Sequence, residues 1–208
     1  MELETIYQNV IDGNAPAVQS GVKEALAEGA DAGTILQEAL IRAMTEIGRR
    51  FESGDLYVPE MLVAARAMQA GLIVLKPLLM ASGVQATGRV AIGTVQGDLH
   101  DIGKNLVAMM LEGAGLEVND LGADVAPERF VQAAQEGVDV IAMSALLTTT
   151  MPAMKRTMDA LEKAGARNRV KVIVGGAPVT REYAKQIGAD GYAPDASSAT
   201  RLVKSVVG

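Results

Sequence analysis

The chain has 208 residues, of which 49% are hydrophobic and only 3% aromatic, so its core must be built mainly from aliphatic side chains. A net charge of −6 argues against nucleic-acid binding, and the absence of cysteine beside a single histidine leaves too few ligands for an ordinary zinc site. The N-terminus lacks the basic start and apolar core of a signal peptide, and no uninterrupted apolar run of about 18 residues occurs, so we expect a cytoplasmic protein without a membrane span.

Residues 1–86 are predicted to be helical throughout. Gly13-Asn14 breaks the first helix, Pro16 suits the first turn of the second, Gly54 ends the third, and Pro59 opens a fourth that runs to about residue 80. Four helices joined by short turns favour a small antiparallel bundle, which we take as the first domain. This domain holds eleven acidic and six basic residues. We interpret that excess as a solvated surface, and a docking face for a basic partner is the alternative.

The hydrophobic pattern changes near residues 84–88, and the segment 81–88 is expected to be a linker and hinge. Residues 87–208 form the second predicted domain, in which apolar runs alternate strictly with amphipathic segments. Strict alternation predicts a Rossmann-like (flavodoxin-like), doubly wound five-stranded parallel sheet, for which we expect the strand order 2-1-3-4-5. The expected strands are 89–95, 116–121, 138–143, 170–174 and 190–193, and the expected helices are 101–113, 127–136, 152–164, 179–187 and 196–206.

The loop after the first of these strands, Gly97–Gly103, contains the only histidine, His100. Asp98 and Asp101 flank it, and a carboxylate beside an imidazole can fix the tautomer and make the other ring nitrogen a better metal donor. The two glycines lack a Cβ, so a ligand or backbone can approach closely. A purely structural His–Asp pair is the alternative that these residues alone leave open.

Two further motifs follow strands of the same sheet. Ser144 begins a loop that contains Leu146, Thr148 and Thr150, and Gly175-Gly176 follows the fourth strand. Because the carboxyl ends of parallel strands share one edge, we expect all three motifs to meet there. One of the two threonines is expected to cap the helix at 152–164. The glycine pair could also be no more than a tight turn.

Together, Asp98-x-His100-x-x-Gly103, the Ser144-Ala-Leu motif and the glycine pair resemble the cobalamin-binding signature of the base-off, His-on class. That class includes methionine synthase and the corrinoid proteins of methyltransferase systems. The resemblance implies that His100 binds cobalt, that Asp98 accepts a hydrogen bond from its other nitrogen, and that Thr150 replaces a serine that completes a proton relay. The corrin ring would supply four further nitrogens. The implied cofactor-binding set is Gly97, Asp98, His100, Asp101, Gly103, Ser144, Leu146, Thr148, Thr150, Gly175, Gly176 and Ala196.

Roles for two of these motifs come from the resemblance alone. The glycine pair would let the nucleotide tail of the cofactor run beside the sheet, and Ser144 would lie near the displaced dimethylbenzimidazole base. The break around residues 49–60 is similar to the cap of methionine synthase. This implies that residues 1–86 cover the upper corrin face, with Phe51 and Val58 over the cobalt. For these two side chains, bundle core is the alternative.

The function implied by the resemblance is that of a methyl carrier whose cobalt alternates between methylcob(III)alamin and cob(I)alamin. The chain has no evident site for a methyl donor or acceptor, so we expect it not to be catalytic alone. One methyltransferase would methylate it from methanol, a methylamine, a methoxyarene or a betaine. A second would pass the methyl group to tetrahydrofolate or coenzyme M, and a reductive activator is a further expected partner. A freestanding cobalamin-dependent sensor is the alternative function.

Overall fold

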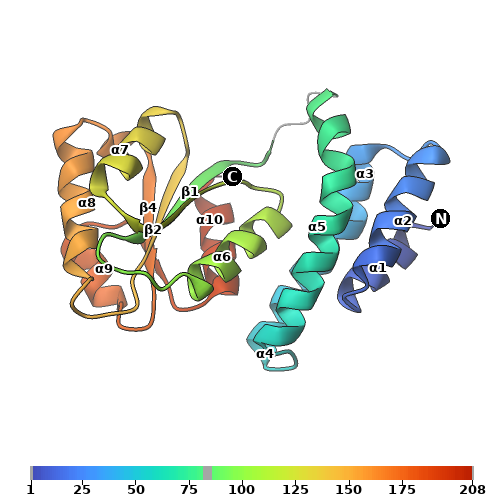
Figure 1. The fold of residues 1–208 in the computed structure, drawn as a ribbon, viewed down its shortest axis with the longest axis horizontal. Coiled ribbons are helices and arrows are strands. Elements are labelled where there is room, and N and C mark those ends of the chain that lie inside the picture. Colours follow the sequence, from blue (N-terminus) through green and yellow to red (C-terminus); the bar gives the residue numbers. More distant parts are fainter. Residues whose placement is uncertain (1, 82–85, 208) are drawn as a thin grey trace. The chain divides into compact units, whose positions relative to one another are not determined.

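The computed structural model describes residues 2–81 and 86–207, apart from the side chains of residues 80 and 81. Residues 82–85 of the linker and hinge expected at 81–88 therefore lie outside the described residues. The chain divides into two compact units, which are described separately. A helical unit comprises Met1–Ala86 with Gly113–Gly115, and an α/β unit comprises Thr87–Glu112 with Leu116–Gly208 (Figure 1).

The helical unit contains four successive helical stretches. They are α1 (Leu3–Ile11), α2 (Ala15–Ala27), a continuous run of α3 (Ala32–Ile35), the π-helical segment η1 (Leu36–Ile41) and α4 (Arg42–Ser53), and finally α5 (Val58–Ala81). The predicted breaks have clear local causes. Asn14 caps α2 by accepting a hydrogen bond from the Ala17 amide at 3.2 Å, and Gly54 ends α4 in the left-handed conformation at φ 80°. The π-helical segment was not predicted, because one extra residue in a turn barely alters the apolar spacing.

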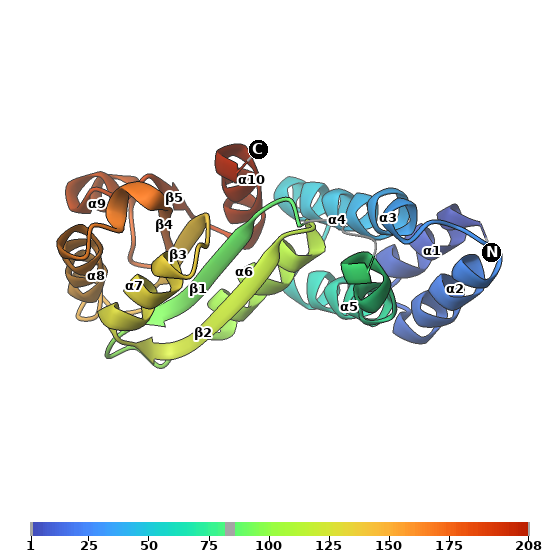
Figure 2. The same cartoon turned by 90° about the horizontal axis from the view of Figure 1, so that it is seen from above.

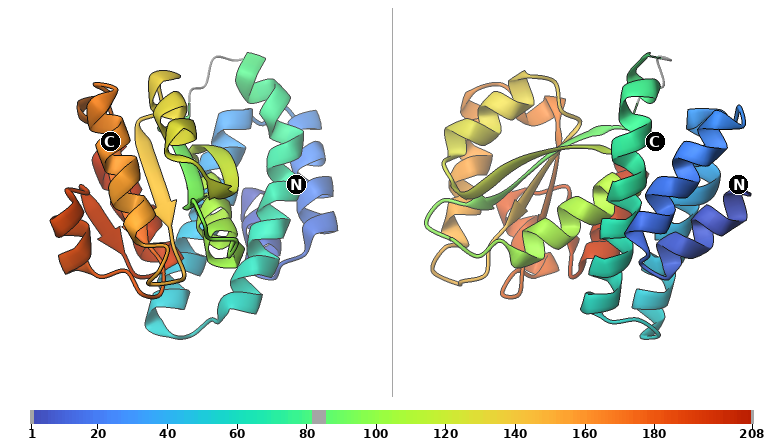
Figure 3. Two further views of the ribbon diagram at one scale, coloured as in Figure 1. Left: turned by 60° about the vertical axis from the view of Figure 1, so that its left-hand side comes forward. Right: turned by 45° about the vertical axis from the view of Figure 1, so that its right-hand side comes forward.

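The helix α5 packs against α2 within this unit (Figures 2 and 3). Between Val58 and Leu79 it has the length and composition of a membrane-crossing helix: an 18-residue window there has a mean hydropathy of 1.5, and 39% of that window is buried inside the structure. Met61, Met68 and Leu75 are among its buried side chains. The core helix of a helical bundle meets the same criterion, so this is weak evidence for a span. The absence of a span stays a prediction.

The α/β unit is built on five parallel strands in the order β2-β1-β3-β4-β5, which confirms the predicted fold class and strand order (Figure 2). Helices α7, α8 and α9 cover one face of the sheet, and α6 and α10 cover the other (Figure 1). The strands are β1 (Arg89–Val95), β2 (Glu117–Val125), β3 (Val140–Ser144), β4 (Lys171–Gly175) and β5 (Gly191–Ala193). The helices are α6 (Ile102–Gly113), α7 (Pro127–Gln135), α8 (Pro152–Lys163), the short 3₁₀ turn η2 (Arg167–Arg169), α9 (Arg181–Ile187) and α10 (Ala196–Val207).

Aliphatic and methionine side chains fill the core between the sheet and α7, α8 and α9, as the composition predicts. Ile141 and Val172 from the strands pack with Met154 and Met158 from α8, and Phe130 of α7 is the fully buried aromatic residue of this cluster. The core holds the strands in register, so that their carboxyl ends stop at nearly the same level. Thr94 of β1 lies beside Ser144 of β3, which in turn lies beside Gly175 of β4.

The strand β2 is longer than predicted, because it continues from the expected end at 121 to Val125. Its pairing with β1 slips twice: Ile92 lies opposite Asp120, Gly93 opposite Gly122, and Val95 opposite Val125. Each slip is a β-bulge, in which the longer strand accommodates an extra residue. The bulges let β2 continue through a polar, glycine-containing sequence that interrupts the apolar pattern on which the prediction depended.

Candidate functional site

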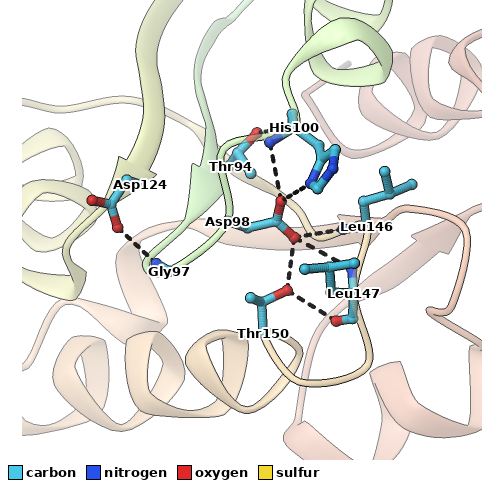
Figure 4. A network of polar contacts seen from close by, with 8 residues as sticks. All are labelled: Thr94, Gly97, Asp98, His100, Asp124, Leu146, Leu147 and Thr150. Atoms are coloured by element: carbon cyan, nitrogen blue, oxygen red, sulfur yellow. Dashed lines mark hydrogen bonds and ion pairs between the residues drawn. The ribbon is translucent and has the colours of Figure 1, made fainter.

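The three motifs meet at the carboxyl edge of the sheet, where Thr94, Ser144 and Gly175 lie side by side. Figure 4 shows how groups from the loops after β1 and β3 converge on Asp98. Each Asp98 oxygen faces a different loop. Oδ1 accepts the backbone N–H of His100 at 3.1 Å and lies 2.7 Å from His100 Nδ1. Oδ2 accepts the Thr150 hydroxyl and the Leu146 amide, both at 2.7 Å, and the Leu147 amide at 3.4 Å. One carboxylate therefore ties the loop after β1 to the loop after β3.

Asp98 is fully buried, and no Lys or Arg within the described residues forms an ion pair with it. Burial by itself raises the pKa of a carboxyl group. Here the hydrogen bonds from the Thr150 hydroxyl, the Leu146 amide and His100 outweigh burial and hold the pKa of Asp98 well below its usual range. The carboxylate is therefore ionised at neutral pH, and it is stabilised by neutral donors and by the imidazole.

The side chain of His100 is about half exposed, at 51%. Its Nδ1 faces the ionised Asp98, so a neutral ring carries its hydrogen on Nδ1 and leaves a lone pair on Nε2, as assigned from this geometry. A carboxylate at Nδ1 makes Nε2 a more basic ligand. No group of three or more His, Cys, Asp or Glu side chains in the described part of the chain could hold a metal ion. A metal at His100 would therefore take its other ligands from a cofactor, which fits a macrocycle that brings its own nitrogens.

Large exposed apolar side chains lie next to His100 in the chain and in the loop after β3. They are Leu99, Ile102, Leu146 and Leu147, with exposed fractions of 76%, 80%, 44% and 42%. Exposed apolar residues grouped around one polar donor are typical of a ligand surface. Gly103 lies among them, and a Cβ added there would meet no heavy atom within 4 Å. Asp101 lies immediately before α6, and its carbonyl accepts the Asn105 amide at 2.7 Å.

The threonine prediction was wrong in one respect, since neither Thr148 nor Thr150 caps α8. The residue at the cap position is Met151, and it makes no side-chain cap bond. Thr148 is exposed, whereas Thr150 is buried and its hydroxyl oxygen lies 2.7 Å from Asp98 Oδ2 and 2.9 Å from the Leu147 carbonyl. The hydroxyl forms a hydrogen bond with the buried carboxylate of Asp98 instead, and the spacing of residues in the sequence does not reveal that contact.

The glycine pair has a structural reason of its own. Gly176 has φ 121°, and a Cβ there would lie 1.9 Å from the Ala145 carbonyl oxygen. A Cβ on Gly175 would lie 2.8 Å from the Ala193 carbonyl oxygen. The ends of β3, β4 and β5 thus approach too closely for side chains, which agrees with a tight turn. Ser144 is half-buried at the end of β3. Contact of these three residues with a cofactor stays a prediction.

Two residues that hold the site were missed in the sequence. Thr94 is fully buried, and its hydroxyl donates to the His100 carbonyl at 3.0 Å. Asp124 accepts the Gly97 amide on Oδ1 at 2.7 Å (Figure 4). Thr94 is the one hydroxyl residue in an otherwise apolar strand, which could have singled it out. Asp124 fell beyond the predicted end of β2, so no pattern in the sequence indicated that it lies beside Gly97.

The remaining predicted site residues are Ala196 of the α/β unit and Phe51 and Val58 of the helical unit. Ala196 is buried in the first turn of α10, where Asp195 accepts the Ser198 amide at 2.7 Å. Phe51, near the end of α4, is half-buried, and Val58, the first residue of α5, is 38% exposed. These last two belong to the helical unit. For all three residues, contact with a cofactor stays a prediction.

Comparison with known proteins matches both units to family models that have the same description. A family model described as a B12 binding domain matches residues 88–201, and a second model with the same description matches residues 2–76. A corrinoid protein of Desulfitobacterium hafniense is 38% identical over 99% of this chain and 97% of its own length. Dimethylamine corrinoid protein 1 of Methanosarcina acetivorans is 42% identical over 99% of this chain and 97% of its own. Trimethylamine corrinoid protein 2 of that organism is 44% identical over 91% of this chain and 88% of its own length.

Solved structures agree with these sequence matches. A cobalamin-binding protein from Desulfitobacterium hafniense matches with a TM-score of 0.81 and 32% identity over 100% of both chains. The methanol:cobalamin methyltransferase complex MtaBC from Methanosarcina barkeri contains a chain that matches with a TM-score of 0.87 and 30% identity. That match covers 99% of this chain and 79% of the other.

Proposed function

The chain belongs to the family of B12-binding corrinoid proteins of methyltransferase systems, and from this premise we propose that it carries a methyl group between two methyltransferases. The bound corrinoid supplies the cobalt atom that takes up and releases the methyl group. The observation that carries the proposal is the half-exposed His100, whose Nδ1 is held by an ionised, buried Asp98. That geometry supports a single protein ligand, His100 Nε2, for a metal that arrives with its own macrocycle.

Each predicted site residue has a defined place in this proposal. Asp98 orients the imidazole and keeps the hydrogen on Nδ1, and Thr150 holds Asp98 by its hydroxyl. The exposed apolar side chains around His100 exclude water from the imidazole when the macrocycle is bound. The rest of the proposed cofactor-binding set is Gly97, Asp101, Gly103, Ser144, Leu146, Thr148, Gly175, Gly176 and Ala196. Phe51 and Val58 of the helical unit are proposed to shield the opposite face of the corrin.

The proposed partners follow from what the chain lacks in its own site. Among the described residues, no group of three or more His, Cys, Asp or Glu side chains could hold a metal ion that would activate a methyl donor or an acceptor. We therefore propose one methyltransferase for the donor and a second that uses tetrahydrofolate or coenzyme M, with a reductive activator. Methanol, methylamines, methoxyarenes and betaines are the donor classes. Methylamines are the first to test, because the dimethylamine and trimethylamine proteins are 42% and 44% identical to this chain, whereas the matching chain of the methanol complex is 30% identical.

The axial ligand can be identified without ambiguity because the chain has one histidine. Full-length protein labelled with nitrogen-15 histidine is reconstituted with hydroxocobalamin, desalted and reduced to Co(II). We expect the nitrogen splitting in the electron paramagnetic resonance spectrum to change from a triplet to a doublet upon labelling, and to disappear in H100A. A triplet that survives labelling would assign the ligand to the cofactor's own base and overturn this site. Failure to retain any corrinoid would overturn the proposed cofactor role.

A methylation assay separates the carrier from a cobalamin sensor. The reconstituted, reduced protein is mixed with a methylamine methyltransferase and its amine, and the visible spectrum is followed. A carrier is methylated within the assay and then loses the methyl group when the second methyltransferase and its acceptor are added. A sensor binds the corrinoid equally well but is not methylated by any donor system of the four classes.

A further inference from the structure

The backbone that presents Asp98 is a tight turn closed by a hydrogen bond from the Asp98 amide to the Val95 carbonyl, at 3.1 Å. Gly97 occupies this turn at φ 87°, a conformation that other residues rarely adopt. A turn that contains glycine is intrinsically free to deform. The position of the Asp98 side chain therefore depends on what else holds this turn.

Asp124 holds the same turn from the neighbouring strand by two hydrogen bonds. Its backbone N–H donates to the Asp98 carbonyl at 2.9 Å, and its Oδ1 accepts the Gly97 N–H at 2.7 Å (Figure 4). We call this reciprocal pair of bonds the Asp124 bracket. The bracket fixes the backbone of Gly97 and Asp98, whereas Leu146 and Thr150 fix the far end of the Asp98 carboxylate.

The bracket exists only because Asp124 adopts a strained backbone. It has φ 54°, and within the described residues no other non-glycine residue has a positive φ. The β-bulge between Gly122 and Val125 places it there. Bulges commonly re-aim a side chain, and aspartate tolerates the left-handed region better than most residues do. Regular pairing between β1 and β2 needs no residue with a positive φ. The one non-glycine residue that has it, within the described residues, is the one whose carboxylate accepts the Gly97 N–H.

We propose that Asp124 is a positioning residue for the proposed cobalt ligand. By fixing the Gly97–Asp98 backbone, it sets Asp98 Oδ1 at hydrogen-bond distance from His100 Nδ1, and so determines how the imidazole presents Nε2. This inference rests on the proposed function only in taking Nε2 as the ligand atom. Asp124 itself contacts neither the imidazole nor any group that would be transferred.

Two substitutions separate the side chain from the backbone. D124G keeps the positive φ without strain and removes the acceptor, whereas D124N keeps an acceptor oxygen and also tolerates this φ. A matched control lies at the opposite end of the same strand β1. Asp139 donates its N–H to the Arg89 carbonyl at 2.8 Å and accepts the Arg89 N–H on Oδ2 at 2.7 Å. D139G therefore removes the same kind of bond and the same charge, away from His100.

The first measurement uses the full-length protein without cofactor. In D124G we expect the Gly97 amide and the single imidazole N–H to exchange with solvent about five- to tenfold faster than in the wild type, which matches the net loss of one hydrogen bond. D124N and D139G should exchange these two hydrogens like the wild type. An unchanged imidazole N–H in D124G, or an equal acceleration in D139G, would overturn the inference.

The second measurement uses the same proteins labelled with nitrogen-15 histidine, loaded with hydroxocobalamin and reduced to Co(II). We expect the fraction of cobalt that shows the histidine doublet to fall several-fold in D124G and to be retained in D124N and D139G. A full doublet in D124G would contradict a positioning role. If the wild type itself shows no doublet, the proposed axial ligand is wrong, and the exchange rates of the cofactor-free proteins still decide whether Asp124 positions the imidazole.

Discussion

Asp98 is a buried anion that pairs with no Lys or Arg in the described part of the chain, and its contribution to the free energy of unfolding depends on pH in a defined way. In the unfolded chain an aspartate has a pKa of about 3.9. The folded-state pKa is lower, because hydrogen bonds from Thr150, Leu146 and His100 outweigh the opposing effect of burial. A lowered pKa contributes stability that is fully present above the unfolded value and is lost as the pH falls through the folded value.

We therefore expect the free energy of unfolding of the Asp98→Asn variant to differ from that of the wild type by an amount that depends on pH. Above about pH 4, the cofactor-free variant should be less stable than the wild type by about 1–3 kcal/mol, because charged acceptors make stronger hydrogen bonds. The difference should narrow as the pH falls below that value. Urea unfolding at a series of pH values measures it. Glu46, whose pKa is lowered to about 2 by hydrogen bonds from Arg49 and Arg50, contributes equally in both proteins. If the difference in free energy of unfolding between the two proteins did not change with pH, the lowered pKa of Asp98 would not be the source of the stability.

At this scale the sequence indicated the centre of the site but not its supports. The contact between His100 and Asp98 was predictable because a lone histidine near an aspartate follows a predicted strand, whereas their role toward cobalt stays a prediction. Thr150 was assigned to the right loop, but the capping role proposed for it or Thr148 was wrong, because the hydroxyl that helix-start statistics assign to a cap instead reaches a carboxylate far away in sequence. Thr94 and Asp124 were missed because their partners depend on strand register and on a bulge, neither of which residue spacing shows.

Among the elements, the ends of the strands decide which substitutions the fold tolerates. Gly176→Ala should destabilise the cofactor-free protein by about 3 kcal/mol or more, because it adds both an unfavourable φ and an overlap with the Ala145 carbonyl. Gly103→Ala is the matched control in the first turn of α6, where a Cβ meets nothing within 4 Å. It should be neutral or stabilising by up to about 1 kcal/mol, because alanine favours the helix.

Urea unfolding of both glycine variants tests this prediction, and hydroxocobalamin retention then tests the proposed site. G103A should fold as well as the wild type yet retain less corrinoid after desalting, since its methyl group enters the space proposed for the cofactor. Equal stability of G176A and the wild type would show that the strand ends are less crowded than described. Unchanged retention by G103A would remove Gly103 from the proposed binding set.

Helices and strands were predictable where the apolar pattern was regular. The parallel strands of the sheet centre are nearly continuous apolar runs, so β1, β3 and β4 were found with small errors at their ends. Two elements departed from the prediction. β2 runs on to Val125 through two bulges, and η1 adds a π-helical turn between α3 and α4. The added part of β2 crosses a polar, glycine-containing sequence that interrupts the apolar pattern, and the π-helical turn barely alters the apolar spacing, so periodicity alone could reveal neither.

For the whole molecule, cofactor binding should be visible as added stability, because cobalamin binds the folded chain and not the unfolded one. At a free hydroxocobalamin concentration of about 100 times the dissociation constant, the free energy of unfolding should rise by about 2.7 kcal/mol. H100A should gain less at the same concentration, whereas D139G should gain as much as the wild type. Urea unfolding of the full-length protein with increasing cofactor provides the measurement. Equal gains in H100A and the wild type would contradict His100 as a ligand.

The fold class was the most predictable property at this scale, because it depends on the order of many elements and tolerates errors in any one of them. The change from helical spacing to strict alternation after residue 86 was enough to indicate a bundle followed by a doubly wound sheet. The strand order followed from the handedness and adjacency rules for parallel sheets. The identity of the methyl donor was not predictable, since the chain's own residues give no site whose shape or charge would select one.

The Thr150 hydroxyl can rotate so that its hydrogen points to either of two acceptors. It carries one hydrogen and lies 2.7 Å from Asp98 Oδ2 and 2.9 Å from the Leu147 carbonyl oxygen, so it donates to only one of them at a time. When that hydrogen turns toward Leu147, a lone pair of the hydroxyl faces Asp98, and a proton on Oδ2 is then hydrogen-bonded without any heavy atom moving. A proton that reached Oδ2 from outside this network would therefore neutralise the carboxylate in place and remove the charge beside the imidazole. In the proposed site, that added proton would weaken His100 as a cobalt ligand, and the turned Thr150 hydroxyl would accommodate it.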